Sequence, residues 1–167
     1  MNDPTFDDVL AGNQRFAQSY HEPGMSGRAA KHLALITCMD SRIDPLAVMG
    51  MDAGDMKILR NAGARVTDDV LRTLVLATYL LDVNRIIVMP HTDCRMAKST
   101  ETQVHETILE RSGVDTRSLE FRTIDDPLRT LAADVQRIRS FPFIPDDVAV
   151  AGAMYDVETG LLRLYDF

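Results

Sequence analysis

Short, mostly apolar runs predict the strands of a single sheet. Four of these runs cover residues 33–36, 56–60, 85–89 and 147–154. Continuous apolar runs of this length are typical of parallel strands that are buried on both faces. A fifth run, residues 161–165, follows the turn-forming sequence Glu158-Thr159-Gly160 and is predicted to be an antiparallel edge strand.

Segments with apolar residues at helical spacing separate these strands. Helix starts are predicted at Asp3-Pro4, Asp44-Pro45, Thr67, Val104 and Asp126-Pro127. The first helix carries an apolar stripe formed by Phe6, Val9, Leu10 and Phe16. The alternation of strands and helices predicts one α/β domain over residues 1–167, with residues 1–30 as an N-terminal helix and loop. Its sheet has a four-stranded parallel core plus an antiparallel edge strand, with helices on both faces.

Composition and charge narrow the possible functions. The 167 residues carry a net charge of −7, and the 18 Lys and Arg residues are dispersed, so we expect no nucleic-acid partner and no membrane partner. No apolar run approaches the ~20 residues that cross a bilayer. Because the N-terminal residues lack a signal-peptide pattern, the expected location is cytoplasmic. There, the two cysteines are expected to be thiols or metal ligands rather than a disulfide.

A polar cluster follows the first predicted strand. Cys38, Asp40 and Arg42 come directly after the apolar run. Residues two apart in an extended chain point the same way, so these side chains can converge. The carboxyl end of a buried strand is also where open α/β sheets form their ligand crevices.

A second cluster follows residues 85–89. His91 and Cys94 are three apart, so a helical turn would place both on one face. Together with Cys38, they supply two thiolates and one imidazole from two strand ends. This set suits Zn²⁺ and leaves a fourth tetrahedral position free of the three groups.

Three motifs in order resemble the β-class carbonic anhydrases, in particular their compact, cab-type branch. They are C-M-D-S-R at 38–42, N-A-G-A-R at 61–65 and H-T-D-C at 91–94, and the resemblance runs from Leu33 to the C-terminus. It implies a Zn²⁺ enzyme that hydrates CO₂ reversibly to bicarbonate, and it places Asn61 and Gly63 at the border of the substrate pocket. An isolated N-A-G would be an ordinary strand-to-helix turn.

The predicted chemistry is the attack of a zinc-bound hydroxide on CO₂. Asp40 would orient the hydroxide and Arg42 would keep Asp40 ionised and away from the metal. The family also has a closed form in which the residue matching Asp40 is the fourth ligand; the cab-type resemblance favours the open form. Pro90 and Arg95 stand where most relatives have glycine, which bears on rate more than on zinc binding. His105 is a weak candidate for a proton shuttle.

Two alternative functions remain open. The same site could act on CS₂ or COS, or the chain could be a non-catalytic zinc-binding or redox-regulatory protein. Retention of Asp40 and Arg42 argues against the second alternative, because metal binding alone does not require this pair. The resemblance further implies a homodimer or homotetramer in which the N-terminal helix lies over a neighbouring subunit; otherwise this helix covers its own core.

Overall fold

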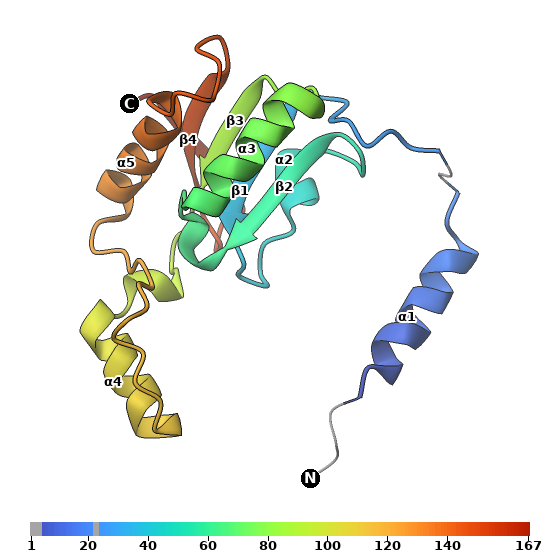
Figure 1. Cartoon of the computed structure of the whole chain (residues 1–167). Coiled ribbons are helices and arrows are strands. Elements are labelled where there is room, and N and C mark those ends of the chain that lie inside the picture. The colour runs from blue at the N-terminus through green and yellow to red at the C-terminus, as the bar shows by residue number, and fades with distance from the viewer. Residues whose placement is uncertain (1–4, 22–23) are drawn as a thin grey trace.

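A computed structural model describes residues 5–21 and 24–167 (Figure 1). Its centre is a five-stranded sheet of order β2-β1-β3-β4-β5. The strands are β1 (Leu33–Cys38), β2 (Met56–Asn61), β3 (Arg85–Met89), β4 (Ala149–Tyr155) and β5 (Leu162–Tyr165). The first four run parallel and β5 is antiparallel to β4. The predicted fold, a parallel core with an antiparallel edge strand, is therefore confirmed.

Helices cover both faces of this sheet, as predicted. The described helices are α1 (Asp7–Gln18), α2 (Pro45–Met49), α3 (Asp68–Leu80), α4 (Glu101–Ser112) and α5 (Pro127–Arg139), with short 3₁₀ turns at Ala62–Ala64 and Arg95–Ala97. On one face, Ile36 of β1 packs in a cluster with α3 and α5. On the other face, Leu35 lies in a second cluster that includes Leu46 of α2. Alternate residues of β1 therefore enter two separate cores, which explains its continuous apolar run.

Side-chain caps set the helix starts. The side chain of Asp44 accepts a hydrogen bond from the Ala47 amide, and those of Thr67 and Asp126 cap α3 and α5 in the same way, as the sequence predicted. Helix α4 begins at Glu101, earlier than the predicted Val104. The reason is a capping box in which Thr100 and Gln103 bond to each other's backbone amides.

Helix α1 projects away from the sheet (Figure 1). None of its residues is buried, and Phe6, at its N-terminal end, is 75% exposed. The alternative in which this helix covers its own core is therefore wrong. The helix begins at Asp7, and the predicted start, Asp3-Pro4, lies outside the described residues.

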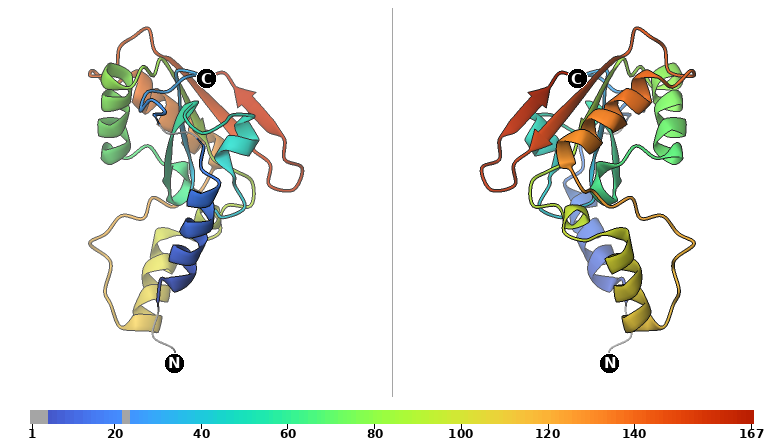
Figure 2. Two further views of the ribbon diagram at one scale, coloured as in Figure 1. Left: turned by 90° about the vertical axis from the view of Figure 1, so that its right-hand side faces the viewer. Right: turned by 90° about the vertical axis from the view of Figure 1, so that its left-hand side faces the viewer.

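Helix α4 is a second projecting element. It contains no buried residue, and the two views of Figure 2 show α1 and α4 extending from the same end of the molecule. Strand β2 points toward that end (Figure 1). The connection from α4 to α5 returns along α4, where the Glu101 carboxylate accepts hydrogen bonds from the Phe121 and Thr123 amides. Among the described helices, none is long and apolar enough to cross a membrane.

Candidate metal centre

Three buried side chains meet at the carboxyl ends of two neighbouring strands. Cys38 ends β1, and His91 and Cys94 follow β3, which pairs with β1. Their potential ligand atoms all lie within 4.8 Å of one another. The two Sγ atoms are 4.0 Å apart, and two thiolates on a tetrahedral zinc ion with normal bond lengths would be about 3.8 Å apart. The spacing of the two sulfur atoms therefore fits a metal ion of zinc's size.

His91 presents one ring nitrogen to this group. Its Nδ1 atom donates a hydrogen bond to the Thr92 carbonyl at 2.7 Å. Its Nε2 atom is buried and has no hydrogen-bond partner within the described chain. Metal-binding histidines typically use one ring nitrogen on the metal and bond the other to an oxygen. The orphaned Nε2 atom is therefore accounted for if it holds a metal.

The ionisation of these groups also suits a cation. The Cys94 thiol donates to Cys38, and this bond, helped by His91 and by the Gly63 amide at 3.4 Å, lowers the pKa of Cys38 against the effect of burial. The same pairing raises the pKa of Cys94. Burial alone would lower the pKa of His91, but the neighbouring Cys38 thiolate raises it. A metal ion would replace the proton that the Cys94 thiol holds here.

The predicted pair of Asp40 and Arg42 forms beside this group. Arg42 donates from Nε to Asp40 Oδ1 at 3.0 Å and from Nη2 to Asp40 Oδ2 at 2.8 Å. These bonds hold the pKa of Asp40 well below its ordinary value. Asp40 Oδ2 lies 3.7 Å from His91 Nε2, but Asp40 does not join the three-residue group. In this arrangement both carboxylate oxygens are directed to Arg42.

The N-A-G-A-R turn supports Cys38 from the side of β2. The Gly63 amide points at Cys38 Sγ, and its φ of +79° is a conformation that glycine adopts freely. The Asn61 side chain bonds in both directions to the backbone of Arg65, at 2.7 and 2.8 Å. Gly63 thus contacts a ligand atom, whereas Asn61 shapes the turn.

The chain between His91 and Cys94 is not helical, so the predicted helical turn is wrong. Thr92 continues the pairing with β4 by donating to the Tyr155 carbonyl. Asp93 then adopts a left-handed conformation (φ 57°), and Cys94 is extended. This reversal brings Cys94 back beside His91, a geometry that spacing alone does not encode. Arg95 is exposed.

Two residues at this site escaped the sequence analysis. Arg60 donates to the carbonyls of Cys38 and Asp40 at 2.9 and 2.7 Å and so fixes the backbone that carries both side chains. An arginine near the end of the apolar run at residues 56–60 was the available signal. Asp93 binds Arg42, and nothing in its sequence context indicated this contact. His105 lies on α4, where its Nδ1 atom is 2.9 Å from Thr116 Oγ1.

Comparisons with known proteins agree with the geometry. The family model for carbonic anhydrase matches residues 33–162. The β-carbonic anhydrase 1 of Mycobacterium tuberculosis is 34% identical over 158 residues, which are 94% of this chain and 95% of that protein. A carbon disulfide hydrolase of Acidithiobacillus thiooxidans is 30% identical over 154 residues (80% of this chain, 76% of that protein).

A solved structure matches the fold over its whole length. The crystal structure of carbonic anhydrase from Streptococcus mutans has a TM-score of 0.93 and 34% identity, covering 99% of this chain and 100% of that chain. The fold, the order of the motifs and the buried ligand group thus agree with one another.

Proposed function

Because this chain belongs to the β class of the carbonic anhydrase family, we propose that it catalyses the reversible hydration of CO₂ to bicarbonate with Zn²⁺ held by Cys38, His91 and Cys94. The observation that carries the proposal is the convergence of these three buried ligand atoms next to an arginine-held aspartate. A structural zinc site would use four protein ligands, whereas a catalytic site uses three and keeps one position open.

The protein's own residues would position the reactants. Asp40 Oδ2 would accept a hydrogen bond from the attacking hydroxyl group and orient a lone pair toward CO₂. Arg42 would keep that carboxylate ionised at neutral pH and turned away from the metal. When bound by the three ligands, Zn²⁺ would supply a Lewis acid that lowers the pKa of a water molecule from ~15.7 toward neutrality.

We assign the open form to this site. The support is the pairing of both Asp40 oxygens with Arg42, which holds the carboxylate toward the guanidinium and apart from the three ligand atoms. In the closed form, the carboxylate would have to give up at least one of these bonds.

The proposal is tested by metal analysis and stopped-flow CO₂ hydration on the same preparation. We expect one zinc per chain and measurable turnover at neutral pH. The Cys94→Ser variant is expected to lose most of both, because a neutral hydroxyl is a much poorer zinc ligand than a thiolate. Stoichiometric zinc without CO₂ turnover would overturn the hydratase proposal and leave the zinc-binding or redox-regulatory alternative.

A second candidate substrate class is CS₂ or COS. The support is the 30% identity to a carbon disulfide hydrolase that this chain matches over 80% of its length. Release of H₂S from CS₂, measured beside CO₂ hydration, separates the two activities. Faster turnover of CS₂ than of CO₂ would reverse our assignment.

We also propose that the chain forms a homodimer or homotetramer, in which helix α1 of the N-terminal segment packs on another copy. Its apolar side chains support this, since Val9, Leu10 and Phe16 are all at least 60% exposed. Analytical ultracentrifugation of the Phe16→Asp variant is expected to show a shift toward monomer, with Gln14→Asp, on the same helix, as the control. The proposed location is the cytoplasm, because a reducing compartment keeps the two free thiols available to a metal.

A further inference from the structure

A chain of alternating charges leads outward from the metal centre. Arg42, which holds Asp40 with one edge of its guanidinium, also donates from Nη1 to Asp93 Oδ2 at 2.8 Å. Its Nη2 atom reaches the Asp93 carbonyl at 3.2 Å. Lys98 forms an ion pair with the other Asp93 oxygen. Asp40, Arg42, Asp93 and Lys98 thus alternate in sign and sum to zero.

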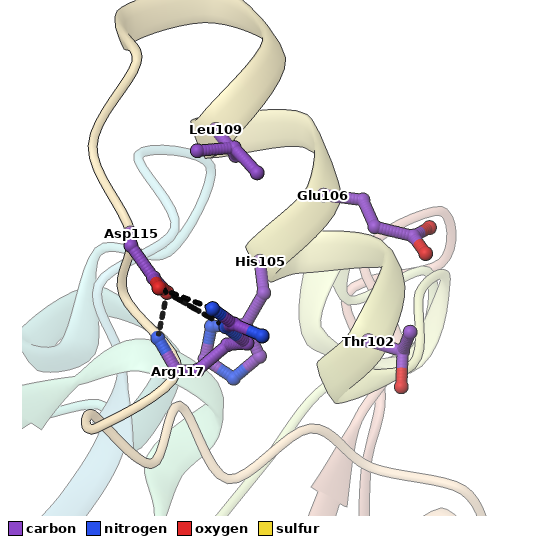
Figure 3. Close-up of a pocket in the computed structure, with 6 residues that line it drawn as sticks. All are labelled: Thr102, His105, Glu106, Leu109, Asp115 and Arg117. Atoms are coloured by element: carbon purple, nitrogen blue, oxygen red, sulfur yellow. Dashed lines mark hydrogen bonds and ion pairs between the residues drawn. The ribbon is translucent and has the colours of Figure 1, made fainter.

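An internal comparison separates the contribution of Asp93 from that of the local motif. Asp115 and Arg117 repeat the D-x-R spacing and form the same bonds, with Nε and Nη2 on the carboxylate and the backbone amide on Oδ1 (Figure 3). Within the described residues, Arg117 forms an ion pair with Asp115 alone, and its side chain is 79% exposed against 45% for that of Arg42. The motif therefore forms the clamp by itself, and Asp93 adds an anchor on a second edge of the Arg42 guanidinium, formed by Nη1 and Nη2.

We propose that Asp93 is a positioning residue that holds Arg42 on Asp40 and so keeps the fourth position of the metal free of the Asp40 carboxylate. The inference rests on the proposed metal site. For Asp40 to become a ligand, its carboxylate must turn away from Arg42, or Arg42 must follow it. An arginine fixed on both edges cannot follow, so the carboxylate loses its hydrogen bonds when it turns.

Lys98 supports this arrangement by balancing the charge of Asp93. Without Lys98, two carboxylates would compete for one guanidinium, and Asp93 would draw Arg42 away from Asp40. With Lys98 present, Asp93 can fix the orientation of Arg42 while most of the guanidinium charge stays available to Asp40. Lys98→Met is therefore expected to change the site in the same direction as loss of Asp93, but less.

The test uses full-length protein loaded with Co²⁺ in place of the native metal, because the visible spectrum of Co²⁺ reports its ligands. Thiocyanate, a small anion, is titrated to occupy the fourth position. Asp93→Gly removes the carboxylate and suits the left-handed backbone at this residue. Since the paired side chains are about half exposed, we expect thiocyanate affinity to fall about fivefold as Asp40 competes for the metal.

Two further variants distinguish positioning from a general structural effect. Asp93→Asn keeps an oxygen that can accept from Arg42, so its thiocyanate affinity is expected to stay within about twofold of the wild type. Asp115→Asn disturbs the matched pair on the 113–126 connection and is expected to leave the spectrum unchanged. Thiocyanate affinity in Asp93→Gly equal to that of the wild type would overturn the proposal. So would a wild-type Co²⁺ spectrum in which a carboxylate already occupies the fourth position.

This readout is separate from that of the proposed function. Failure of the chain to hydrate CO₂ while it binds Co²⁺ and thiocyanate would count against the hydratase assignment only. Unchanged thiocyanate affinity in Asp93→Gly, in a protein that turns over CO₂, would count against the role of Asp93 only.

Discussion

Replacement of Gly63 by alanine tests how tightly the turn after β2 is packed against the metal centre. Gly63 has a φ of +79°, which disfavours any residue with a Cβ atom. An added Cβ would also lie 3.0 Å from Cδ1 of Ile124 and 3.2 Å from Cγ of Met96. Ile124 is buried, so it has little room to move away. The substitution therefore combines backbone strain with overpacking.

The two effects can be separated by a matched variant. Gly113 has a similar φ of +71°, but an added Cβ would meet no atom within 4 Å. Gly113→Ala is therefore expected to cost only the backbone strain, about 1 kcal/mol in the free energy of unfolding. Gly63→Ala adds overpacking and should cost about 2–4 kcal/mol. Because the Gly63 amide donates to Cys38, we also expect this variant to hold zinc more weakly.

Urea unfolding at one fixed protein concentration measures both costs, and a zinc-chelator competition measures metal retention. A fixed concentration matters because the proposed association of subunits would contribute to stability. If Gly63→Ala destabilises the protein no more than Gly113→Ala does, the turn is not packed as described. Unchanged zinc retention would show that the Gly63 amide does not support the thiolate.

Further predictions concern buried charge, pH and the metal. Asp134→Asn should lower the free energy of unfolding by about 2 kcal/mol, because the buried Arg65–Asp134 pair at 2.7 Å loses its anion. Asp69→Asn, in an exposed pair, is the control and should cost under about 0.5 kcal/mol in the same urea titration. Partial burial opposes the ionisation of Glu101, but hydrogen bonds from backbone amides, led by Thr123, hold its pKa below the usual 4.5. Glu101 therefore stabilises the folded protein above pH 4.5, and this stabilisation is lost as the pH falls through the lower pKa of the folded state. The cost of Glu101→Gln in the free energy of unfolding should be full at pH 7 and should shrink when unfolding is measured at progressively lower pH. Chelation of the metal should lower the melting temperature measured by calorimetry, and an unchanged melting temperature would contradict a buried metal site.

The features that could be predicted from the sequence are those set by local pattern. The run at β1 indicated a buried parallel strand because its residues enter both cores, and Cys38 follows the run directly. The capping side chains of Asp44 and Thr67 bond to backbone amides only three residues away, so these helix starts could be predicted. The start of α4 at Glu101 could also have been predicted, although the sequence analysis placed it at Val104, because Thr100 and Gln103 have capping-box spacing.

The remaining features depend on contacts that are distant in sequence. Arg42 and Asp93 are 51 residues apart, and Arg60 lies 22 residues from the Cys38 carbonyl it binds. No spacing rule indicates such pairs. At Asp93 the chain reverses through a left-handed backbone conformation. Aspartate also occurs in ordinary turns, so its presence in the sequence does not predict this conformation. The exposure of α1 shows that an amphipathic stripe does not by itself predict a face buried within the same chain.

The most direct test of the central claim is the rate of CO₂ hydration by zinc-loaded protein at neutral and alkaline pH, compared with that of Asp40→Ala. An open metal site working through Asp40 and Arg42 predicts turnover at both pH values and a large loss of turnover in the variant. Turnover by the wild type only at alkaline pH would contradict the open site, and equal turnover by the two proteins would contradict the role of Asp40.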